Sequence, residues 1–235
     1  MIVKHCTSTL ILAALLSLST SLMATPEVAE QPEFSRANSL LFLNDHLTRH
    51  DYSARYTYVS SQTGSRDSDY EDRIIITAHR IPGSDAKRVE FDASTRIGQN
   101  QIPVVDQARG NPLIMVFLQS DMLELAKATG GHWRYFQKQM KLALEHDAQV
   151  EPVTIEFKGE RLNAQRITVR PFAEEQVRRK ELGRYLNKTY EFLLSEDLPG
   201  EIFELRSVTP AEEESEGIVV EKVTLQKFEK LPDEG

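Results

Sequence analysis

Two histidines stand at a spacing that could bind a metal ion. His46 and His50 are four residues apart in a segment whose apolar periodicity predicts a helix over residues 34–50, and side chains at that spacing share one helix face. Two imidazoles so placed can share a zinc ion. In zinc proteases a glutamate follows the first histidine, but Leu47 stands there, and no third ligand can be assigned. The alternative is a solvated polar face at the end of the helix. We predict no metal site, and a metal-dependent enzyme using His46 and His50 is the weakest functional hypothesis.

Residues for other kinds of catalysis follow no recognisable pattern. The single cysteine is Cys6, near the start of the chain, and no Gly-x-Ser-x-Gly sequence is present. His132 follows Gly130-Gly131, where backbone amides and a ring could meet an anion. The alternative is that these glycines end one helix and free the next. Without a catalytic signature we expect no catalytic residues, no cofactor and no enzymatic activity.

An apolar pair of helices in the middle of the chain is the most informative segment. Asn111-Pro112 predicts the start of a helix, residues 113–128 are dense in apolar side chains, Gly130-Gly131 ends that helix, and a second helix begins near His132. A helix that is apolar on most sides must be covered on most sides. The cover is either an ordinary core or a curved sheet whose cavity also admits an apolar ligand. In the second case the candidate lining residues are Met115, Phe117, Leu118, Met122, Trp133, Phe136 and Met140.

The segments on either side of these helices predict strands. Apolar and polar residues alternate in residues 52–58, 89–93, 153–157, 162–169 and 190–194. Three consecutive isoleucines, Ile74–Ile76, mark a strand over 70–80, and further strands are expected over 102–105, from 203 to 205 and from 219 to 225. The alternation changes parity within 162–169, which predicts a bulge near Gln165–Arg166. Runs of strands separated by clustered helices indicate an α+β fold. We expect a curved antiparallel sheet, an incomplete barrel of about seven to nine strands, with an N-terminal helix and a mid-chain helical hairpin packed on its concave face.

The start of the chain predicts export. Lys4 precedes an apolar run, Leu10–Leu22, that is shorter than the roughly 20 residues of a spanning helix. We therefore expect a signal peptide over residues 1–24, a flexible lead over 25–33, one α+β domain over 34–230 and a flexible tail over 231–235. The mature protein would be periplasmic and would not be transmembrane.

Charge bears on the choice of partner. The net charge of −8 becomes −9 when Lys4 is removed, since the signal segment contains no acidic residue. An acidic balance argues against binding to nucleic acid, which needs clustered positive charge.

Three segments carry a resemblance to a known group. The first, Leu40–Tyr58, reads LLFLNDHLTRHDYSARYTY, and with the apolar Asn111–Leu118 it resembles the periplasmic lipoprotein carriers of the Lol type. The third, Ser195–Leu205, reads SEDLPGEIFEL and is similar to uncharacterised periplasmic proteins with related curved sheets. The resemblance is architectural and covers most of the mature chain. It implies an incomplete barrel that cups helices and holds acyl chains on a concave apolar surface, and it assigns no functional residue.

Two main hypotheses on function remain. The first is a non-enzymatic binder or carrier of a hydrophobic ligand, such as a lipid, an acyl chain or lipoprotein-like cargo. The second is an envelope protein–protein interaction module without a ligand, in which the basic cluster Arg178–Lys180 or the sheet edges dock on a partner. The alternative for that cluster is a surface helix with ion pairs to Glu174, Glu175 and Glu181.

Overall fold

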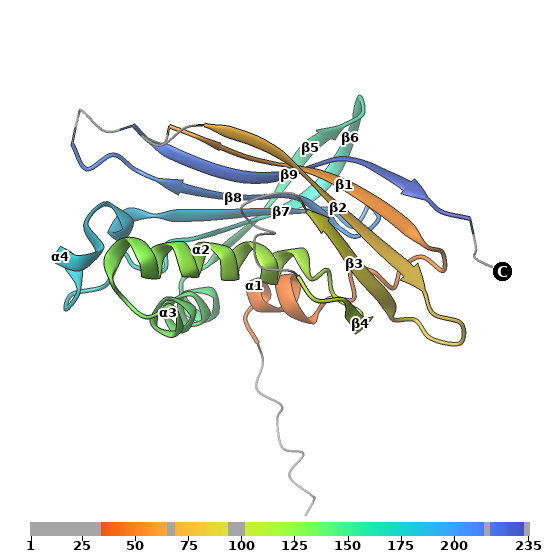
Figure 1. Ribbon diagram of the computed structural model, residues 1–235, viewed down its shortest axis with the longest axis horizontal. Helices are drawn as coiled ribbons and strands as arrows, with labels where there is room; N and C mark the ends of the chain where they lie inside the picture. The colour runs from red at the N-terminus through yellow and green to blue at the C-terminus, as the bar shows by residue number, and fades with distance from the viewer. Residues whose placement is uncertain (1–33, 65–68, 94–101, 214–216, 233–235) are drawn as a thin grey trace, which may run out of the picture. The chain divides into compact units, whose positions relative to one another are not determined.

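One antiparallel sheet forms most of the protein. The computed structural model describes residues 34–64, 69–93, 102–213 and 217–232. The predicted signal peptide 1–24, the lead 25–33 and most of the tail 231–235 lie outside these residues. Within them, nine strands pair in the order β4-β3-β2-β1-β9-β8-β7-β6-β5 (Figure 1). The strands are β1 (Ala54–Thr63), β2 (Tyr70–Arg80), β3 (Lys87–Ala93), β4 (Val105–Ala108), β5 (Gln149–Phe157), β6 (Glu160–Val169), β7 (Thr189–Leu194), β8 (Ile202–Thr209) and β9 (Val219–Lys230).

The pairing of β1 with β9 joins the two runs of strands into one sheet. Ala54 pairs with Lys230 and Thr63 with Val220, so the first strand and the last strand lie at the centre of the strand order. The short β4 and the hairpin strand β5 are its two ends, so the sheet is open and not a closed barrel. The predicted α+β fold with an antiparallel sheet of seven to nine strands is confirmed.

The two middle helices lie together on one face of the sheet (Figure 1). They are α2 (Leu113–Thr129) and α3 (Trp133–His146). The side chain of Asn111 accepts a hydrogen bond from the Leu113 N–H at 3.1 Å, which caps the start of α2. Gly130 ends the helix with φ of 68°, a left-handed conformation that glycine adopts without steric cost. The predicted helical hairpin is confirmed.

The hydrophobic core lies between this hairpin and the sheet. Leu113, Phe117 and Leu125 of α2 are buried with Phe136 of α3 in one cluster that also holds strand residues. From the strands it includes Tyr58, Ile76, Val89, Tyr190, Phe192, Leu205 and Val223. Full burial of one large apolar side chain contributes about 1.5–3 kcal/mol, so this contact is the main source of stability.

The N-terminal helix is shorter than predicted. It consists of α1 (Arg36–Asn38) and a π-helical turn, η1 (Ser39–Leu43), and the backbone is extended at Asn44. The predicted continuation to residue 50 is therefore wrong. The Leu47 N–H donates to the carbonyl of Arg109 at 2.9 Å, and this tertiary hydrogen bond replaces the helical one that the apolar periodicity suggested.

Two smaller predictions about strands are also wrong. The short fourth strand spans Val105–Ala108 and not 102–105. No register shift is present near Gln165–Arg166 in the pairing of β6 with either neighbour. Ala164 and Ile167 are both buried although they lie on opposite faces of β6. The apolar residues therefore change from even to odd positions because both faces of the strand are buried, and no bulge is needed.

None of the helices in the described part of the chain is long and apolar enough to cross a membrane.

The contact between α3 and the core predicts a large loss on truncation. Phe136 is almost fully buried, and its ring meets the edge of Phe172 at 5.7 Å between centroids. Phe136→Ala should lower the free energy of unfolding by about 3–5 kcal/mol, because it leaves a cavity. Leu142→Ala, at a half-exposed position of the same helix, should change it by about 0.5 kcal/mol or less. Urea denaturation measures both, and equal effects would contradict the assignment of α3 to the core.

Candidate functional site

A partly enclosed cavity of about 620 Å³ lies between the C-terminal half of α2 and the sheet. Its walls come from α2, from the last residues of β1 and β8, from the first residues of β9, and from the 3-10 helix η3 (Gly183–Asn187) with the residue after it. The lining residues that matter for the argument below are Ser60, Phe117, Ser120, Asp121, Leu125, Lys188, Glu221 and Val223. The position is that of the second alternative, a cavity between the hairpin and the sheet, while the buried cluster beside it matches the first, an ordinary core.

The walls of this cavity are both apolar and polar. Phe117 and Leu125 of α2 and Val223 of β9 supply buried apolar surface. Ser60 and Thr209 supply buried hydroxyl groups from the strands. The chemistry therefore differs from the wholly apolar cavity that the sequence suggested, because charged and hydroxyl-bearing side chains stand beside the aromatic and aliphatic ones.

A buried ionic cluster forms part of the wall. The Lys188 ammonium group contacts the Asp121 carboxylate and lies 3.3 Å from Glu221 Oε2. The Tyr190 hydroxyl donates to the second oxygen of Asp121, and the Ser207 hydroxyl donates to Glu221 at 2.9 Å. Side chains of Lys188 and Asp121 are only 4% and 5% exposed. Since α2 supplies Asp121 and the other members belong to or flank the strands, the cluster fastens α2 to the sheet.

The protonation states follow from burial and from the partners. Although burial opposes its charged form, the two carboxylates raise the pKa of Lys188 above its usual value. Burial favours the neutral form of Glu221, but Lys188 holds its pKa below the usual range. Burial raises the pKa of Asp121, and the charge of Glu221 adds to the shift. One ammonium group thus faces two carboxyl groups, of which Asp121 takes up a proton more readily.

The predicted lining residues lie in different places. Phe117 is the one of the seven that lines this cavity. The buried core cluster contains Leu118, Met122, Phe136 and Met140 together with Phe117. Met115 is 47% exposed on the opposite side of α2. Trp133 is half-buried at the start of α3, with the Arg134 guanidinium 4.8 Å from its ring centroid.

The sequence did not predict the ionic cluster, although one signal was present. Asp121 is the only charged residue between Leu113 and Leu123, in a helix that has to be covered on most sides. A carboxylate in such a position needs a buried partner. Its partner Lys188 lies 67 residues away in the sequence, and no local pattern connects the two.

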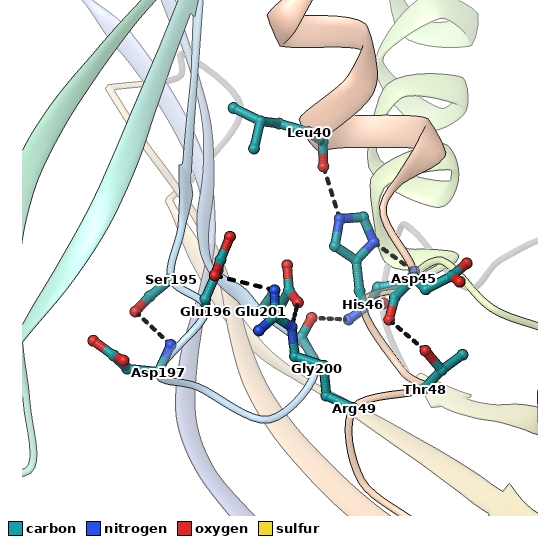
Figure 2. Close-up of polar contacts among 11 residues, drawn as sticks. Leu40, Asp45, His46, Thr48, Arg49, Ser195, Glu196, Asp197, Gly200 and Glu201 are labelled. Atoms are coloured by element: carbon teal, nitrogen blue, oxygen red, sulfur yellow. Dashed lines mark hydrogen bonds and ion pairs between the residues drawn. The ribbon is translucent and has the colours of Figure 1, made fainter. Parts of the chain in front are cut away.

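The paired histidines do not form a metal site. His46 lies beyond the end of the helix and is fully buried, with Nε2 2.8 Å from the carbonyl of Leu40 (Figure 2). Its Nδ1 accepts a hydrogen bond from the Asn111 N–H at 3.0 Å, so both ring nitrogens are in use. The His50 ring instead stacks on Tyr52, with 5.0 Å between centroids. The prediction that these rings share a helix face is wrong.

The described residues contain no group of three or more His, Cys, Asp or Glu that could hold a metal ion. His132, the other histidine considered for chemistry, uses Nδ1 to accept a hydrogen bond from the Arg134 N–H at 3.2 Å. It therefore caps the start of α3, and Gly130 ends α2 as the second interpretation of Gly130-Gly131 predicts.

The basic cluster at residues 178–180 makes surface contacts. The Arg178 guanidinium lies 4.4 Å from the Tyr135 ring centroid and 3.9 Å from Glu181, and Arg179 donates to the carbonyl of Glu175 at 3.3 Å. These contacts favour a surface segment held by ion pairs and stacking. Docking of a partner on this cluster stays a prediction.

The ionic cluster gives a test of how α2 is held. Lys188→Met should lower the free energy of unfolding by about 3–5 kcal/mol, because it leaves two buried carboxylates without a cation. This loss should shrink as the pH falls from about 7 to about 5, since protonation then removes the carboxylate charge. Lys127→Met, at an exposed position of the same cavity, should cost about 0.5 kcal/mol or less. Denaturation at both pH values measures this, and a Lys188→Met protein as stable as Lys127→Met would show that the cluster does not hold α2.

Comparison with known proteins gives a weak likeness to one group. Neither the protein families nor the curated proteins contain a match to this chain. Among solved structures, the chain is similar to a Vibrio parahaemolyticus domain assigned to outer membrane lipoprotein sorting, with 7% identity, a TM-score of 0.23, and coverage of 77% of this chain and 86% of that one. It is also similar to a LolA superfamily protein of Nitrosomonas europaea, with 10% identity, a TM-score of 0.22, and coverage of 85% and 94%. The resemblance to the Lol type that the sequence predicts is thus found again, and it is weak. What this chain binds has to be argued from its own cavity.

Proposed function

We propose that this chain is a non-enzymatic binding protein or carrier that acts in the periplasm and holds its ligand in the cavity between α2 and the sheet. The cavity itself is the observation that carries the proposal. Its volume of about 620 Å³ is within the range of roughly 300–1,000 Å³ that small-molecule sites occupy. The likeness to solved structures is too weak to contribute to this argument.

The mixed walls favour an amphipathic ligand over a wholly apolar one. Phe117, Leu125 and Val223 can contact an acyl chain. Ser60 and the Lys188–Glu221 ion pair present polar groups to the cavity, and a hydrocarbon placed against them offers no hydrogen bond in exchange for their water. A lipid with one acyl chain and a polar group, or an acylated peptide, satisfies both parts of the wall.

Filling the cavity should abolish binding. Ser120 of α2 lines the cavity and is half-buried, so Ser120→Trp places an indole ring in the space. Titration with a dansyl-labelled fatty acid, followed by displacement with a lysophospholipid, measures the affinity. We expect wild type to bind saturably and Ser120→Trp to bind at least about tenfold more weakly.

Met115→Trp is the matched control. Met115 lies on the same helix but is exposed on its other side and does not line the cavity. It should bind the probe like wild type. No saturable binding by wild type, or equal affinity of the wild-type and Ser120→Trp proteins, would overturn the proposal. Weaker binding by Met115→Trp alone would move the site to the outer face of α2.

A further inference from the structure

A second polar junction, distant from the ionic cluster, joins three segments at His46 (Figure 2). The N-terminal segment contributes Leu40 and His46, the residue that caps α2 is Asn111, and the turn between β7 and β8 contributes Gly200. The Asn111 side chain donates to the Gly200 carbonyl at 3.0 Å while its backbone N–H donates to His46. The start of α2 is thus held by the imidazole ring on one side and by the turn on the other.

The partners of the ring determine its protonation state. The Asn111 N–H can only donate, so Nδ1 of His46 must be unprotonated. The Leu40 carbonyl can only accept, so Nε2 must carry the hydrogen. His46 is therefore the neutral Nε2–H tautomer. A proton added to Nδ1 would face the Asn111 N–H, and two donors cannot share one hydrogen bond.

The charged groups around His46 offset only part of the cost of such a proton. Asp45, in the same segment, is bound by Arg109 through two hydrogen bonds of 3.0 and 2.6 Å. Glu201, at the β7–β8 turn, is bound by Arg49, which also pairs with Glu196 at 3.1 Å. Each of these carboxylates already faces a guanidinium group. Burial lowers the pKa of His46, with the Leu40 carbonyl, Glu201 and Asp45 opposing that shift.

We propose that His46 is an acid-sensitive latch, whose protonation releases the N-terminal segment 36–47 from the start of α2. The contact with Asn111 is lost and a buried cation is created, so the junction opens and the ring reaches water. Since α2 forms one wall of the cavity, opening would also loosen that wall. This last consequence rests on the proposed function, whereas the latch itself does not.

The direction of the pH dependence follows from the lowered pKa. The unfolded chain binds a proton on His46 near its ordinary pKa of about 6.5, whereas the folded chain binds it only at lower pH. The junction therefore has its full stability above about pH 6.5 and loses stability as the pH falls toward the folded-state pKa. Below that value the loss levels off.

Hydrogen exchange of the full chain, detected by mass spectrometry, tests the latch at about pH 7.5 and about pH 5.5. After correction for the intrinsic exchange rate, peptides covering 36–47 and 111–118 of wild type should exchange faster at the lower pH, by up to about tenfold. His46→Gln should abolish this difference, since a carboxamide both donates and accepts but does not titrate here. His146→Gln, at an exposed helix end, should behave like wild type.

Equal exchange of wild type at the two pH values, or an unchanged difference in His46→Gln, would overturn the proposal. If His46→Gln does not fold, NMR of the imidazole nitrogens of His46 in wild type tests the latch instead. We expect the Nε2–H tautomer at about pH 7.5 and its loss in step with the faster exchange. Observation of the Nδ1–H tautomer or of a charged ring at that pH would also refute the latch. None of these readouts requires a ligand, so a failed latch leaves the binding proposal standing.

Discussion

The need to bury one apolar side of α2 organises this protein. Its residues that face the sheet and α3 are buried, whereas Met115 and Leu123 stay 47% and 39% exposed. The sheet covers one side of α2, and α3 packs beside it within the same hydrophobic cluster. Because the turn at Gly130-Gly131 is short, α3 must run back along α2. The packing of α3 on α2 therefore depends on residues that are close in the sequence. The open nine-stranded sheet then has one face largely occupied by the hairpin.

Polar contacts hold α2 at two places. Its first turn is held by Asn111 and His46, and its second half is held by Asp121 and Lys188. Charged groups in such positions do not add much stability compared with an apolar core. They do allow only one orientation of the helix, because a rotated helix would bury Asp121 away from Lys188. Between these two places α2 packs on the sheet through apolar side chains. The cavity lies beside Asp121 and Lys188.

Sequence reasoning was most successful where the determinants are local. Alternation identified the strands, and the glycine pair located the end of α2, because both depend on neighbouring residues. It failed where a contact between residues far apart in the sequence determines the structure. The N-terminal helix stops early because Leu47 bonds to Arg109. The cavity residues include Ser60 and Lys188, which no pattern links to α2. Uniform apolarity along α2 also concealed which side meets the sheet, so Met115 was predicted to line a cavity that it faces away from.

Native mass spectrometry of the full chain, purified without detergent, addresses the central claim most directly. The account predicts a species heavier than the polypeptide by the mass of one amphipathic molecule, which organic solvent extracts and which rebinds with a stoichiometry of one. A spectrum with the polypeptide mass alone, unchanged after incubation with lysophospholipids and fatty acids, would contradict it. The space between α2 and the sheet would then be a water-filled gap in a protein that binds no such ligand.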